Sequence, residues 1–108
     1  MVKRDSTPKW LTGVVEKIHR LASEKRIIFT YKVTQEIEAL ELGLDFDDVC
    51  DVITSLSGGD FHARIASEVT GEWLYVFKPR VGGSIIYVKL ILREDCIVIS
   101  FHEDEDEN

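Results

Sequence analysis

The stretch WLYVFKPRVGGSIIYVKLILREDCIVISFH, residues 73–102, decides the fold, because apolar and polar side chains alternate along it between turn signals. Two of these signals, Gly82-Gly83 and Glu94-Asp95, lie inside the stretch, and Thr70-Gly71 lies just before it. Together they divide the chain from residue 61 onward into four strands of similar length. Such a series of short strands and turns predicts an antiparallel meander.

Treating Gly82-Gly83 and Glu94-Asp95 as two-residue turns fixes a register for three strands. The first turn pairs Arg80 with Ile85, Lys78 with Tyr87 and Val76 with Lys89; the second pairs Lys89 with Ser100 and Tyr87 with His102. Since side chains alternate between the faces of a sheet, both turns sort the residues in the same way. The face expected to pack against helices contains Trp73, Tyr75, Phe77, Val88, Leu90, Leu92, Ile97, Ile99 and Phe101.

The opposite face is expected to be open, and Lys78, Tyr87 and His102 should form a row across it. The whole expected set is Leu74, Val76, Lys78, Arg80, Tyr87, Lys89, Arg93, Ser100 and His102. His62 and Arg64 should join this face if their strand lies at the edge of the sheet beside residues 73–80.

The first half of the chain predicts helices. Thr7 and Pro8 resemble a helix start, and apolar residues at helical spacing continue to about Ser23. A strand is expected over 26–33, a second helix from a Thr34 cap through Leu42, and a third from Asp45 to the turn at 57–60. Two or three helices followed by a meander predict an α+β domain, with the helices packed on one face of a mainly antiparallel sheet.

Length and composition restrict the class of protein. The 108 residues, 44% of them hydrophobic, suffice for one domain, expected over 1–102, and no apolar run is long enough to span a membrane. The N-terminus has no secretory signal, so a cytoplasmic protein is expected. Cys50 and Cys96 lie in apolar patterns and are interpreted as buried thiols, with a disulfide as the alternative. Three scattered histidines and no Cys/His cluster argue against a zinc site.

The formal charge of −7 is unevenly distributed. Residues 36–60 carry −8 and the tail 103–108 carries −5, whereas residues 61–102 carry +1 and residues 1–35 carry +5. The tail is expected to be a disordered, solvated end. The open face is therefore predicted to be basic although the chain is acidic, and the tail could compete with a phosphate there or tune His102.

A face of Lys, Arg, Tyr and His without a carboxylate suits an anion rather than a metal ion. For RNA it supplies the parts of metal-free strand cleavage: a base for the 2′-hydroxyl, an acid for the leaving oxygen and positive charge for the phosphorane. Histidine can take either proton-transfer role. Each of these residues alone is more often plain surface, so the prediction depends on their convergence on one face.

Several motifs, in chain order, resemble the motility quorum-sensing regulator (MqsR) family of toxin ribonucleases. They are ELGLDFDDVCDVITSLS at 41–57, Asp60-Phe61, FKPR at 77–80, YVK at 87–89 and IVISF at 97–101. The resemblance implies a RelE-like toxin fold and a metal-independent endoribonuclease that cleaves mRNA without the ribosome and needs no cofactor. It also implies a cognate antitoxin, zinc-containing with a helix-turn-helix domain, through which the pair would bind operator DNA.

The family's site residues carry over only in part. Its tyrosine and lysine correspond to Tyr87 and Lys89, and its Arg-Pro-Arg to residues 78–80. Elsewhere the family's Tyr-Lys pair becomes His62-Ala63 with Arg64 next, its glutamine becomes Leu74, and its C-terminal lysine becomes His102.

We therefore expect the histidines and Arg64 to replace the family's lysines. The expected catalytic residues are Tyr87, His102, Lys78, Arg64 and His62, and the expected RNA-binding residues are Arg80 and Lys89. The alternative is a non-catalytic module that uses the sheet face or edge to hold a protein or RNA.

Overall fold

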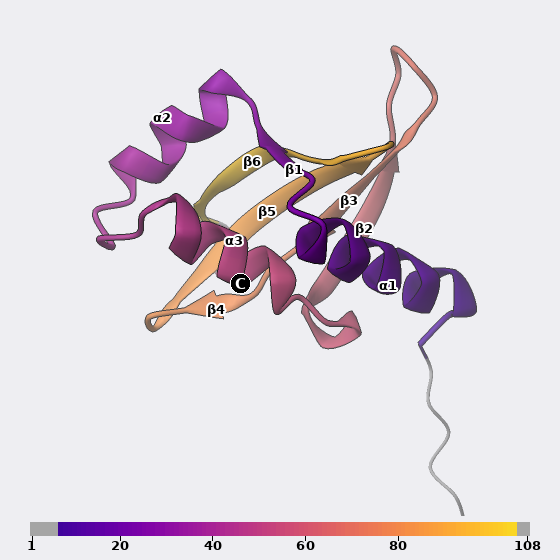
Figure 1. The fold of residues 1–108 in the computed structure, drawn as a ribbon, viewed down its shortest axis with the longest axis horizontal. Helices are drawn as coiled ribbons and strands as arrows, with labels where there is room; N and C mark the ends of the chain where they lie inside the picture. Colours follow the sequence, from indigo (N-terminus) through magenta and orange to yellow (C-terminus); the bar gives the residue numbers. More distant parts are fainter. Residues whose placement is uncertain (1–6, 106–108) are drawn as a thin grey trace, which may run out of the picture.

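The computed structural model describes residues 7–105 and has the predicted α+β architecture (Figure 1). In chain order its elements are α1 (Lys9–Ser23), β1 (Ile27–Phe29), α2 (Tyr31–Ala39), α3 (Phe46–Thr54), the short 3₁₀ turn η1 (Gly58–Asp60), β2 (Phe61–Ala66), β3 (Trp73–Phe77), β4 (Arg80–Val81), β5 (Ser84–Leu92) and β6 (Cys96–Glu103). Within residues 7–105 no helix is long and apolar enough to cross a membrane.

The main sheet has the order β1-β6-β5-β3-β2, and only the β1–β6 pair is parallel. The predicted meander is therefore confirmed, with a short β4 added where Pro79 interrupts the strand expected over 73–80. The turn at Gly82 and Gly83 has φ values of 59° and 86°, which glycine adopts without strain and which a two-residue hairpin requires. The pairs Arg80–Ile85, Val76–Lys89, Lys89–Ser100 and Tyr87–His102 all occur as predicted.

A bulge between β5 and β6 changes the predicted packing of β6. Leu92 pairs with Cys96, so the turn between β5 and β6 has three residues, 93–95, and the prediction of a two-residue turn at Glu94-Asp95 was wrong. Further along, Lys89 pairs with Ser100 but Leu90 pairs with Val98, so Ile99 is an extra residue. Because one extra residue reverses the alternation, Cys96 and Val98 are buried in the core, and Ile97 and Ile99 are only half-buried. Assigning Ile97 and Ile99 to the helix-packed face was wrong.

A second bulge, in β2, moves Arg64. Phe61 pairs with Phe77 but Ala63 pairs with Val76, which leaves His62 as the extra residue. From that point Arg64 is opposite Tyr75, on the face that packs against α1, and not on the open face. The predicted position of Arg64 was therefore wrong.

The segment from residue 26 to 42 is more helical than predicted. The strand expected over 26–33 is only Ile27–Phe29, and the cap of α2 is Thr30, whose hydroxyl accepts from the Val33 N–H. Thr34 instead lies inside the helix, which ends at Ala39 rather than Leu42. Similarly, α1 begins at Lys9 with Pro8, not Thr7, at the cap.

The predicted start of α3 is confirmed as a capping box. The Asp45 carboxylate accepts from the Asp48 N–H at 2.8 Å, and the Asp48 carboxylate accepts from the Asp45 N–H at 3.0 Å. Replacing Asp45 with alanine removes this cap, so we expect the free energy of unfolding to fall by about 1 kcal/mol in urea titrations. The control Asp47→Ala removes an acid from the same turn without a cap and should cost no more than about 0.5 kcal/mol. Equal losses would contradict the role of the cap.

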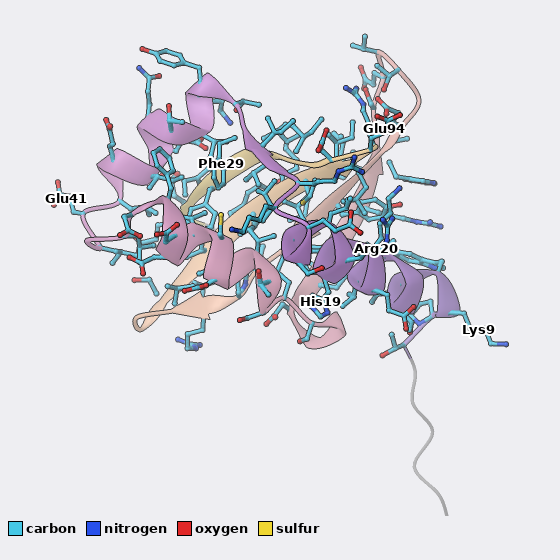
Figure 2. All side chains as sticks on the ribbon, viewed as in Figure 1. Lys9, His19, Arg20, Phe29, Glu41 and Glu94 are labelled. Carbon is cyan, nitrogen blue, oxygen red and sulfur yellow. The ribbon has the colours of Figure 1, made fainter. Side chains whose placement is uncertain are left out.

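The helices lie on one side of the sheet, with α1 and α3 in front of it in Figure 1 and α2 beside β6. The core between these layers consists of Leu11, Ile18, Leu21, Val33, Ile37, Val49, Ile53, Leu56, Phe77, Ile86, Val88, Leu90, Cys96, Val98 and Phe101. On α1, His19 (labelled in Figure 2) bonds through Nε2 to the Leu56 carbonyl at 2.7 Å, which ties α1 to the end of α3. Both cysteines are free thiols, and burial raises the pKa of Cys96 to about 12.

Candidate active site on the open sheet face

Tyr87 and His102 form the centre of the open face, as the register predicted. They are directly opposite each other on β5 and β6, and their rings stack with centroids 5.1 Å apart and planes inclined by 11°. The Nδ1 atom of His102 lies 2.9 Å from the Glu103 carbonyl oxygen. Because a carbonyl only accepts, this bond places a proton on Nδ1 and leaves the Nε2 lone pair free in the neutral ring. In that tautomer, Nε2 is the ring nitrogen that is able to accept a proton.

Lys78 lies beside this pair but just outside the ladder. β3 and its pairing with β5 end at Phe77, so Lys78 does not pair with Tyr87 as predicted. The backbone N–H of Lys78 donates to the Asp60 carbonyl at 2.7 Å. Its ammonium lies 3.3 Å from the Asp104 carboxylate, with side chains only 18% and 9% exposed, respectively. The expectation that no carboxylate shares this face was wrong.

The position of Asp104 follows from the same register that placed His102. Asp104 is two residues further along, and its N–H donates to the Ile85 carbonyl at 2.8 Å. Extending the Tyr87–His102 pairing by two residues would have placed Asp104 on the open face. The tail was expected to be disordered from residue 103, but Glu103 is the last residue of β6. Residues 106–108 lie outside the described part of the chain.

A further row contains Lys89 and Ser100, two residues from Tyr87 and His102 on the same face. Ser100 is 3% exposed, and its hydroxyl accepts from the ammonium of Lys32 on α2 at 3.1 Å. Lys32 also donates to the Ile99 carbonyl and pairs with Glu36 at 3.2 Å. Lys32 therefore fastens α2 to β6, a role that the helical pattern gave no reason to expect.

Beside His102 the surface is hollowed. An open cavity of about 550 Å³ is lined by Glu36, Ala39, Leu40, His102, Glu103 and Glu105. Its three carboxylates make this side of the histidine acidic, whereas Lys89 lies on the other side. An anion would therefore approach the stacked rings over β5 and not over α2.

The remaining predicted residues are dispersed. Arg80 is exposed on β4 opposite Ile85, and His62 is exposed in the β2 bulge. Leu74, at the position of the family's glutamine, is a half-buried partner of Ile91. The structure thus brings together Tyr87, His102, Lys78 and Lys89, and it separates Arg64 from them. Residues 7–105 contain no group of three or more His, Cys, Asp or Glu side chains that could hold a metal ion.

The chain is thus a small α+β protein whose open sheet face carries proton-transfer and cationic groups. Proteins of this class are suited to act on anions. Residues 13–103 match the model of a family described as motility quorum-sensing regulator, toxin of MqsA. The mRNA interferase toxin MqsR of Escherichia coli strain K12 is 34% identical over 89 residues, which cover 78% of this chain and 91% of that protein. The chain belongs to the motility quorum-sensing regulator toxin family, which confirms the resemblance noted in its motifs.

Proposed function

We propose that this chain is the toxin of a toxin–antitoxin pair and an endoribonuclease that cleaves mRNA, without metal and independently of the ribosome. The observation that carries the proposal is the stack of Tyr87 on His102, with Lys78 and Lys89 on either side. Family membership supports it, and the E. coli relative is itself named an mRNA interferase toxin.

In the proposed mechanism, His102 Nε2 removes the proton from an RNA 2′-hydroxyl. The freed 2′-oxygen attacks the adjacent phosphorus, and the bond to the 5′-oxygen breaks, leaving a 2′,3′-cyclic phosphate. The Tyr87 hydroxyl donates its proton to the leaving 5′-oxygen, and solvent then restores both side chains. Lys78 and Lys89 stabilise the negative charge that develops on the phosphorane.

Two of the expected catalytic residues take no step in this mechanism. Arg64 lies on the opposite face, and His62, in the β2 bulge, makes no hydrogen bond or ring stack with Tyr87 or His102 in the described part of the chain. Arg80 keeps its proposed role of binding a neighbouring phosphate, because it is exposed on β4 beside Lys78.

The family description also supports an antitoxin partner for this chain. We extend the proposal to an antitoxin with a zinc site and a helix-turn-helix domain, through which the pair would bind its operator, and to a cytoplasmic location. Purification of the chain with the product of the neighbouring reading frame, followed by zinc analysis and operator binding, tests this extension.

The test of cleavage uses purified protein, a transcript and excess EDTA. We expect cleavage to persist with the chelator and to leave 2′,3′-cyclic phosphate ends, which mapping of 5′ ends and end-group analysis would detect. Tyr87→Phe keeps the stack but lacks the proton donor, so its rate should fall by about 10²-fold. Tight RNA binding by wild-type protein without cleavage would instead favour the non-catalytic binding module, and an undiminished rate in Tyr87→Phe would remove Tyr87 as the acid.

A further inference from the structure

A second cationic group lies on the helix-packed side of the sheet. The guanidinium of Arg64 on β2 is held between Trp10 of α1 and Trp73 of β3, 4.0 and 4.1 Å from the two ring centroids. Trp10 is in turn packed against Phe61 and Tyr75. We call Trp10, Arg64 and Trp73 the Trp–Arg–Trp stack. Two cation–π contacts fix the plane of a side chain that would otherwise be mobile.

The stack leaves hydrogen-bond donors available. Within residues 7–105, Arg64 has neither an ion pair nor a hydrogen bond, and it is exposed, so the N–H groups of its guanidinium are available as donors. Trp73 is 43% exposed, so part of its ring is also accessible. The stack therefore presents donors and an aromatic surface, and no carboxylate among residues 7–105 forms an ion pair with Arg64.

The stack is continuous with the proposed active site around the edge of the sheet. β2 is the edge strand, and Figure 1 shows it beside α1. Its sequence, FHARIA, contains no acid, and the residue before it, Asp60, accepts the Lys78 backbone N–H through its carbonyl. Lys78 and Tyr75, the partner of Arg64, are three residues apart, or about 10 Å along the strand. Because the side chains of Lys78 and Arg64 lie on opposite faces, RNA that contacts both must also pass around the edge of the sheet at β2.

We propose that the Trp–Arg–Trp stack binds single-stranded RNA adjacent to the cleaved phosphate, with a base on the exposed face of Trp73 and a phosphate on the N–H groups of Arg64. This inference rests on the proposed function, which supplies RNA as the ligand. Aromatic planes combined with arginine are the usual means of holding single strands without regard to sequence. The charge of the surface complements a polyanion, and the acid-free strand β2 links it to Lys78.

The chain contains its own probe for this site. It has two tryptophans, and both belong to the stack, so fluorescence excited selectively in tryptophan, and not in the three tyrosines, reports on this surface. A fully 2′-O-methylated oligoribonucleotide of about 12 nucleotides lacks the 2′-hydroxyl that the proposed cleavage requires, so it serves as a ligand that is not cut. We expect it to quench the fluorescence, with a dissociation constant about tenfold higher for Arg64→Ala and a salt slope lower by about 0.7. Arg64→Lys, which keeps the charge but not the planar donors, should lie between the two.

The matched control is Arg20→Ala. Arg20, labelled on α1 in Figure 2, is exposed and paired with Glu24, so this variant loses the same charge outside the stack. It should bind the oligonucleotide like the wild type. Since Trp10 packs on the core, circular dichroism must first show that Arg64→Ala is folded; Trp73→Leu, which removes the exposed ring, provides a second variant with the same expected loss.

Unchanged RNA affinity in Arg64→Ala and Trp73→Leu, or binding without quenching, would overturn the inference. So would loss of affinity for the purified antitoxin with RNA affinity intact, because the surface would then serve a protein partner. Failure of the proposed function gives a different result. If the wild-type chain binds the oligonucleotide through Arg64 but cleaves no unmodified RNA, the RNA surface stands and the catalytic assignment falls.

Discussion

The His102→Ala variant is expected to cleave RNA about 10²–10⁴-fold more slowly than the wild-type chain, with its fold intact. His102 lies on the open face of β6 and contributes to no part of the core, so its loss removes the stacked partner of Tyr87 and the Glu103 contact but no buried packing. The free Nε2 of His102 is also the one proton acceptor in the proposed mechanism. Single-turnover cleavage of a short RNA measures the rate, and a urea titration measures the stability.

A second variant separates the proposed role of His102 as a base from its packing against Tyr87. His102→Gln retains an amide that can donate to the Glu103 carbonyl but cannot carry a proton at neutral pH. We expect it to be as slow as His102→Ala and as stable as the wild type. If His102→Gln cleaved at the wild-type rate, the histidine would only support Tyr87, and the proton acceptor would have to be sought elsewhere.

The sequence predicted the centre of the site partly because the first turn is determined locally. The Gly82-Gly83 turn sets which residues of β3, β4 and β5 face each other. The second turn has three residues, 93–95, instead of the predicted two, and the extra residue Ile99 in β6 offsets this difference, so the pair Tyr87–His102 occurs as predicted because the two deviations cancel. The capping residues of α3 are equally local, since Asp45 and Asp48 bond to each other's backbone. Such features depend on neighbours in sequence and can therefore be predicted without the structure.

The errors arise where one extra residue alters the alternation. No residue type marks the bulges at His62 and Ile99, because tertiary packing determines them: β2 must place Phe61 against Trp10 and Phe77, and β6 must place Cys96 and Val98 in the core. The first bulge carried Arg64 to the other face. The acidic tail was a second source of error. Residues 103–108 were expected to be separate from the sheet, whereas Asp104 continues the alternation of β6.

The second large effect that we expect is a gain in RNA affinity on replacement of Asp104. Its carboxylate is 3.3 Å from the Lys78 ammonium, so it offsets part of the charge that Lys78 offers to a phosphate. Removing the negative charge with Asp104→Asn should make RNA bind about tenfold more tightly and steepen the salt dependence by about 0.7. Lys78→Met should have the opposite effect on affinity. Fluorescence anisotropy with a 2′-O-methylated RNA measures both.

We expect the two variants to differ also in stability, which provides a second measurement. Lys78→Met leaves a 9%-exposed carboxylate without its ammonium, so the free energy of unfolding should fall by about 1–3 kcal/mol. The double variant with Asp104→Asn should recover this stability but should lack the gain in affinity of Asp104→Asn alone. Glu103→Gln is the matched control, because it removes one charge next to Asp104 from an exposed side chain that has no ion pair in the described chain. If Glu103→Gln tightened RNA binding as much as Asp104→Asn, the effect would be general repulsion by the acidic end, and Asp104 would not mask Lys78.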